Sequence, residues 1–225
     1  MEKKYYTYTL NTMVLNVIAL LILFVFVIIN YAFFDINILD IKICTLVIMT
    51  LWLILHEVIH AIGFLLSFDV KRSNVVFGMF LEKGIFYCMC KQEISKKSIL
   101  FSLLLPLITI GIITLIVGYI ISSPLLVLLS IINISGCAGD IMMWFFMMRL
   151  PNDVRYLDLD DPTSFTMISD KDLSGVKVLG IELKDSGIYD SKKMYARDKS
   201  RIKISNLSWV FLIILCILYI IDLLI

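Results

Sequence analysis

Apolar runs long enough to cross a bilayer recur along this chain, separated by shorter polar segments. About 20 consecutive apolar residues span the hydrocarbon core of a membrane, so these runs predict transmembrane helices. The predicted helices lie at about 13–29, 43–67, 99–121 and 125–148, and a last one lies within 207–225. The first run follows two lysines as a signal peptide would. Its nearly full spanning length and the lack of a small-residue cleavage site predict a retained helix instead.

The polar segments between these runs predict the domain organisation. We expect a membrane core over residues 1–148, a hydrophilic segment over 149–206 that forms a small cytoplasmic module, and a C-terminal transmembrane helix within 207–225. Two short β-like runs after the second helix predict a β-hairpin at about 75–90. The sequence therefore predicts an all-α integral membrane protein with about five transmembrane helices and one membrane-associated β-hairpin.

The hairpin is apolar on both faces, which leaves two interpretations of its place. It either dips into the membrane beside a functional site or packs on the helices. In the first case, its strand edge could pair with an extended substrate by strand addition.

Composition and charge support a membrane protein and give it an orientation. Hydrophobic residues make up 60% of the chain and charged residues only 17%, and the net charge of +1 gives no reason to expect nucleic acid as a partner. Basic residues gather on alternate polar segments, whereas the two opposite loops hold only Lys42. By the positive-inside rule we expect a multi-pass protein of the cell membrane. Its N-terminus is cytoplasmic and its C-terminus lies outside. Tyr5, Tyr6 and Tyr8 precede the first helix, where an interfacial aromatic belt belongs.

One turn of the second predicted helix carries three ionisable residues in an otherwise apolar run. His56, Glu57 and His60 form the pattern H-E-x-x-H, and the chain has only these 2 histidines. On a helix the two imidazoles lie one turn apart on one face and can bind one zinc ion. Glu57, about 100° round the helix, can act on a water molecule at that ion. Ionisable groups at membrane depth cost about 2.5–3.5 kcal/mol each, so we favour a metal site over a chance polar cluster.

Asp140 in the fourth predicted helix is the expected third zinc ligand. Counted from the cytoplasmic ends of their helices, Asp140 and the H-E-x-x-H motif both lie about 14 Å deep at 1.5 Å per residue. The alternative is an aspartate that is paired or lines a polar cavity. Asn133, seven residues earlier on the same helix face, could hold a substrate backbone or a developing oxyanion, or it could form an interhelical hydrogen bond.

Two other polar groups are assigned no site. Cys88 and Cys90 share one face of a predicted strand, and we interpret them as small apolar residues because no other cysteine pair or spare histidine completes a metal site. The acidic run at 158–161 lacks the spacing and the glycine of a calcium-binding loop. We expect a solvated turn there.

These motifs resemble those of intramembrane zinc metalloproteases of the site-2 protease type and, more closely, a bacterial family of zincin membrane peptidases. The resemblance rests on the H-E-x-x-H helix, the apolar hairpin and the run from Asn133 to Asp140 and Ile141, and it covers about residues 40–165. The chain departs from site-2 proteases in lacking their proline and Leu-Asp-Gly motif around the aspartate. A PDZ-like domain is also not visible.

The resemblance implies a zinc metallopeptidase that hydrolyses peptide bonds of membrane proteins or membrane-associated peptides in the lipid bilayer. Zn²⁺ would be held by His56, His60 and Asp140 toward the cytoplasmic side, with Glu57 as general base and Asn133 as a further catalytic residue. The substrate must be extended or locally unwound, because a transmembrane helix hides its amides in internal hydrogen bonds.

Two other classes of function compete with the enzyme. One is a non-enzymatic, zinc-stabilised membrane protein acting in immunity, sensing or partner binding. A structural zinc site has four protein ligands and needs no base, so Glu57 favours the enzyme. The other is a transporter, which would usually show internal repeats, and the sequence shows none.

Overall fold

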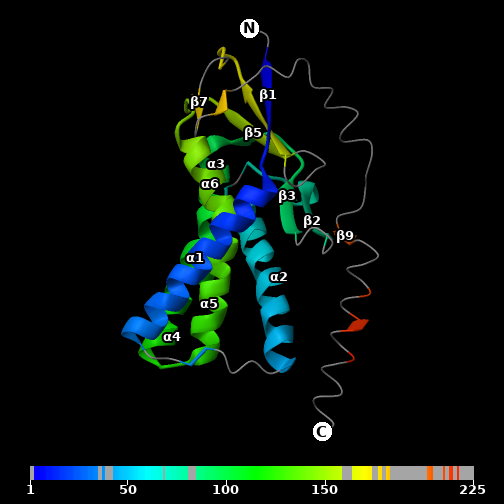
Figure 1. The fold of residues 1–225 in the computed structure, drawn as a ribbon. Helices are drawn as coiled ribbons and strands as arrows, with labels where there is room; N and C mark the ends of the chain where they lie inside the picture. Colours follow the sequence, from blue (N-terminus) through cyan, green and yellow to red (C-terminus); the bar gives the residue numbers. More distant parts are fainter. Residues whose placement is uncertain are drawn as a thin grey trace.

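The computed structural model describes residues 3–34, 37–38, 43–67, 69–80, 85–158 and 164–173, together with 177–178, 181–182, 202–204, 210, 213–214 and 217. Long helices occupy one end of the described chain, and a small sheet covers the other end (Figure 1). The protein is mostly helical, as the sequence predicts. Of the predicted C-terminal helix, residues 210, 213–214 and 217 are helical, and the rest lies outside the described residues.

Within the part of the chain that the structure describes, three helical segments are long and apolar enough to cross a membrane. The first two are α1 (Thr12–Phe33) and α2 (Ile43–Leu66). The third is one continuous run of three elements: α3 (Lys96–Pro106), the π-helix η3 (Leu107–Ile113) and α4 (Thr114–Ile120). The π-helix begins directly after Pro106, where the sequence predicts a kink or bend because proline lacks an N–H group. These segments match the first three predicted helices to within a few residues.

The fourth predicted helix is broken into two. α5 (Pro124–Gly136) and α6 (Ala138–Met148) meet at Cys137 with a bend of 44°, and together they could form a fourth span. The break places Asp140 in the first turn of α6. Free N–H groups and the helix dipole stabilise a carboxylate at that position.

The expectation of an all-α protein is wrong, because the described residues form three small sheets. The largest has the strand order β1-β6-β5-β4 and is antiparallel throughout. Its strands come from the N-terminus, from the residues before α3 and from the segment after α6: β1 (Lys4–Thr9), β4 (Ile94–Ser95), β5 (Arg155–Asp158) and β6 (Ser164–Ser169). A two-stranded sheet pairs β7 (Lys177–Val178) with β8 (Ile181–Glu182).

The N-terminal tyrosines also correct an expectation, since two of them do not form an interfacial belt. Tyr6 and Tyr8 are 0% and 9% exposed, in one core with residues of α2, α3 and α6. They share a strand face because alternate residues of a strand point the same way. Tyr8 stacks on Phe146 of α6, with ring centroids 4.9 Å apart. The sheet is thus joined to the helix ends by a continuous apolar core.

The third sheet contains the hairpin that the sequence predicts. β2 (Val75–Phe80) and β3 (Ile85–Cys90) pair antiparallel, with Val75 opposite Cys90, and residues 81–84 lie outside the described part of the chain. β2 also pairs in parallel with β9 (Ile202–Ile204). β3 contacts α2 and β5 on its other side, so this strand lies between the hairpin partner and the H-E-x-x-H helix.

Candidate metal centre

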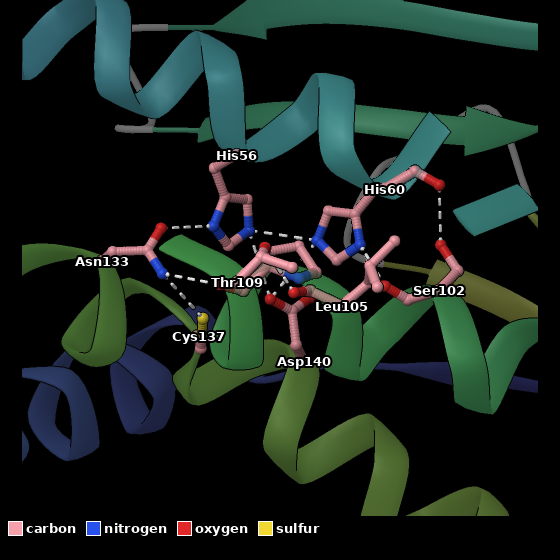
Figure 2. A network of polar contacts seen from close by, with 9 residues as sticks. His56, His60, Ser102, Leu105, Thr109, Asn133, Cys137 and Asp140 are labelled. Carbon is pink, nitrogen blue, oxygen red and sulfur yellow. Dashed lines mark hydrogen bonds and ion pairs between the residues drawn. The ribbon is translucent and has the colours of Figure 1, made fainter. Parts of the chain in front are cut away.

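The structure brings the three predicted metal ligands together in one cluster (Figure 2). The Nε2 atoms of His56 and His60 lie 3.0 Å apart. The Oδ2 atom of Asp140 lies 3.3 Å from the first and 3.4 Å from the second. One turn of α2 aligns the two imidazoles, and the break between α5 and α6 brings the carboxylate to them.

The hydrogen bonds behind the rings define which nitrogen of each histidine carries the proton. His60 Nδ1 lies 2.9 Å from the Ser102 carbonyl oxygen, which can only accept, so Nδ1 is the donor. Asn133 donates from Nδ2 to the Pro106 carbonyl at 3.2 Å, which turns its Oδ1 toward His56 Nδ1 at 2.9 Å. His56 therefore also donates from Nδ1. Both rings keep their Nε2 lone pairs for the cluster.

This set of donor atoms fits a zinc ion. Two bare ring nitrogens and a carboxylate oxygen facing one another in a buried site repel unless a cation lies between them. A tetrahedral ion with bonds of about 2.0–2.1 Å holds its ligand atoms about 3.3 Å apart, close to the observed separations of 3.0–3.4 Å. Three protein ligands are also the number typical of a catalytic zinc site, which leaves one position for water or substrate.

A cavity of about 260 Å³ lies beside the cluster, with walls from α1, α2, β3, α3, α6 and β5. Glu57 lines this cavity together with the three ligands. The backbone of Cys88 in β3 lies within hydrogen-bonding reach of the Glu57 carboxylate. Glu57, the carboxylate of the H-E-x-x-H motif, therefore faces this cavity and is not part of the ligand cluster. The cavity is the space where a substrate would lie.

Asn133 occupies a different place from the ligands and Glu57. It is buried in α5, behind His56, and is not among the residues that line the cavity. Besides its contacts with His56 and Pro106, its Nδ2 lies 3.7 Å from Cys137 Sγ. The geometry matches the interhelical hydrogen bond that the sequence leaves open as an alternative to direct contact with substrate.

Sequence reasoning missed Ser102 of α3. Its carbonyl accepts the hydrogen bond from His60, and its Oγ donates to the His60 carbonyl at 2.9 Å. Gly63, three residues after His60, permits this contact, because an added Cβ would lie 2.7 Å from Ser102 Cα. Small residues on two apolar helices predict such close approach, and that signal was available in the sequence.

For Asp158 the prediction from the sequence was wrong. Instead of belonging to a solvated turn, it is buried at the end of β5 and lines the cavity. It accepts hydrogen bonds from the Cys90 N–H at 2.7 Å and from the Tyr156 hydroxyl at 2.5 Å. Burial raises the pKa of this carboxyl from 3.8 to about 6. Residues 159–161 of the acidic run lie outside the described chain.

The fold and the site together define a protein with helices long and apolar enough to span a membrane and a His–His–Asp cluster suited to zinc. Residues 49–155 match the sequence model of a protein family described as "Putative zincin peptidase". The matched segment contains the H-E-x-x-H helix, the hairpin and Asp140, so the resemblance to this family is confirmed over this part of the chain. No curated protein and no solved structure matches the chain.

Proposed function

We propose that this protein is a membrane-embedded zinc metallopeptidase that hydrolyses peptide bonds of membrane-associated substrates. The observation that carries the proposal is the convergence of His56, His60 and Asp140 beside a cavity that Glu57 also lines. A bound zinc ion supplies a Lewis acid that polarises the scissile carbonyl and acidifies water. Glu57 would then accept a proton from the attacking water and deliver it to the leaving amine.

The position of β3 supports an extended substrate. β2 occupies one edge of β3, while the N–H of Cys90 points away from β2 toward Asp158. Peptide groups alternate sides along a strand, so those of Phe86 and Cys88 also point away from β2. Both residues line the cavity. We infer that an extended peptide lies in the cavity beside this edge of β3, which fits the requirement that the scissile bond be extended.

The proposal includes the site-2-like arrangement in the cell membrane: five transmembrane helices, a cytoplasmic N-terminus and an external C-terminus. The division into a core (1–148), a cytoplasmic module (149–206) and a last helix within 207–225 belongs to it as well. The basic polar segments support this orientation. The cavity has walls from both the first helices and β5, which is consistent with an active site near the cytoplasmic ends of the helices.

The test measures bound zinc and proteolysis separately in detergent-purified protein and in cells. Wild type and Glu57→Gln are expected to hold about one zinc per chain, while His56→Ala and Asp140→Ala lose most of it. A co-expressed reporter with one transmembrane segment and a tag at each end would be cleaved by wild type and by none of these three variants. Glu93→Gln is the matched control, because Glu93 pairs with Lys3 near the surface and is remote from the cluster.

Each outcome bears on a different part of the proposal. Cleavage by Glu57→Gln at the wild-type rate would refute the general-base role. Zinc bound by wild type with no cleavage of any reporter in a broad panel would favour the zinc-stabilised, non-enzymatic alternative. No zinc in wild type would refute the metal centre itself.

A further inference from the structure

The third span changes from α-helix to π-helix beside the metal centre, and the proline at this change leaves one carbonyl without its helical partner. In an α-helix the carbonyl of Ser102 accepts from the N–H of residue 106. Residue 106 is proline and has no N–H to give. The Nδ1 atom of His60 donates to this carbonyl instead, at 2.9 Å. Ser102 and His60 are both buried, so each group would otherwise lack a partner.

The same proline also contacts the residue that supports the other histidine. The Pro106 carbonyl accepts from Asn133 Nδ2 at 3.2 Å. Because a carbonyl can only accept, this bond fixes which end of the amide is which. The amide oxygen then faces His56 Nδ1 at 2.9 Å (Figure 2). A change in the backbone at residue 106 therefore affects the hydrogen-bond partners of both His60 and His56.

We propose that Pro106 is a positioning residue of the metal centre. By withholding the helical donor from the Ser102 carbonyl, it leaves the acceptor capacity of that carbonyl to His60 and so favours the Nδ1–H form of that ring. The Pro106 carbonyl also accepts a hydrogen bond from the Asn133 amide. This bond turns the amide oxygen toward His56 and so favours the Nδ1–H form of that ring. Partners of this kind hold a ligating ring in the tautomer that presents Nε2 to the metal, and their loss typically weakens metal binding 10- to 100-fold.

This inference rests on the proposed zinc site but not on catalysis, and it can be tested in metal-free protein. The chain has only 2 histidines, so ¹⁵N-histidine labelling gives ring signals from these two residues alone. Chemical shifts distinguish an N–H nitrogen from a bare one. Spectra of detergent-solubilised protein at pH 8.5, assigned with His56→Gln and His60→Gln, would report the tautomer of each ring.

The decisive variant is Pro106→Ala, which gives the Ser102 carbonyl back its helical donor. We expect the Nδ1–H form of His60 to become less populated, because its acceptor is then shared with a helical N–H. His56 should keep its tautomer, because residue 106 still offers a carbonyl to Asn133. Asn133→Ala should do the reverse. Ser102→Ala retains the carbonyl and should leave both tautomers unchanged. Pro124→Ala is the matched control, because Pro124 is in the first turn of α5, where no N–H is needed.

Zinc affinity, measured by competition with a chelator, is the second readout. We expect it to fall 10- to 100-fold in Pro106→Ala and to stay at the wild-type value in Pro124→Ala. Circular dichroism checks folding, which a regained helical hydrogen bond should not harm. A wild-type tautomer of His60 together with wild-type zinc affinity in Pro106→Ala would overturn the inference. Tautomers that shift as expected in a protein that binds no zinc would support the inference and refute the proposed function.

Discussion

Replacing Gly63 by alanine should weaken zinc binding without touching any ligand. The added Cβ would lie 2.7 Å from Ser102 Cα and 3.1 Å from its Cβ. Carbon atoms pack comfortably at about 3.5–4.0 Å, so α3 must move away from α2 by about 1 Å. The hydrogen bond from His60 to the Ser102 carbonyl is 2.9 Å long, and such a shift would carry it beyond bonding range.

The expected size of the effect follows from the two groups that lose contact. A buried donor or acceptor left unpaired costs about 1–3 kcal/mol, and a ligand without its outer partner binds metal about 10- to 100-fold more weakly. The assay is zinc competition against a chelator, run beside thermal unfolding of the metal-free protein. Alanine favours a helix over glycine by about 1 kcal/mol, so local propensity acts in the opposite direction.

Gly136→Ala is the matched control for this prediction, because an added Cβ there meets nothing within 4 Å. It should keep the wild-type zinc affinity. If Gly63→Ala lowered the melting temperature and yet bound zinc as wild type does, the contact between α2 and α3 would be structural only. The reasoning from helix spacing to metal affinity would then fail.

Three further measurements test other parts of the structure. Burial raises the pKa of Asp158 to about 6, so the folded state should lose about 3 kcal/mol as the pH rises from 4 to 7, and Asp158→Asn should remove that loss in pH-dependent unfolding. Lys96 donates to the Leu150 carbonyl at 2.6 Å beyond the end of α6, so Lys96→Met should destabilise the fold by about 1.5–3 kcal/mol in thermal unfolding. Chelation of bound metal should lower the melting temperature, and an unchanged value would argue against a zinc site.

The parts of the fold that the sequence predicts are those encoded within one continuous segment. The H-E-x-x-H spacing is such a signal, because helical geometry alone puts both histidines on one face. The depth of Asp140 could be counted along a second helix for the same reason. The break at Cys137 was not predicted, although Gly136 and Gly139 flank it. Its consequence for the cluster depends on how two helices pack, which periodicity does not encode.

The parts that were missed depend on contacts between distant segments. The four-stranded sheet joins β1 to β6 and β4 to β5, whose partners lie far apart in the sequence, and no local pattern encodes such pairing. Asp158 belongs to this sheet, so its burial was missed with it. The acceptor for His60 is a backbone carbonyl, which no residue type marks. Its trace in the sequence is Pro106, four residues after Ser102, which signals a carbonyl without a helical donor.

The four-stranded sheet also has a consequence for how often the chain crosses the membrane. Strands of one sheet must lie on one side of a bilayer, since an open sheet cannot pass through the hydrocarbon. Between β1 and β4 the chain runs through α1 and α2, an even number of candidate spans. Between β4 and β5 it runs through the span of α3, η3 and α4 and then through α5 and α6. The number of crossings between β4 and β5 must be even too. If the span of α3, η3 and α4 crosses the membrane, the bent pair α5 and α6 must cross back as a full span. The broken helix that carries Asp140 is then a complete crossing of the membrane rather than a re-entrant loop.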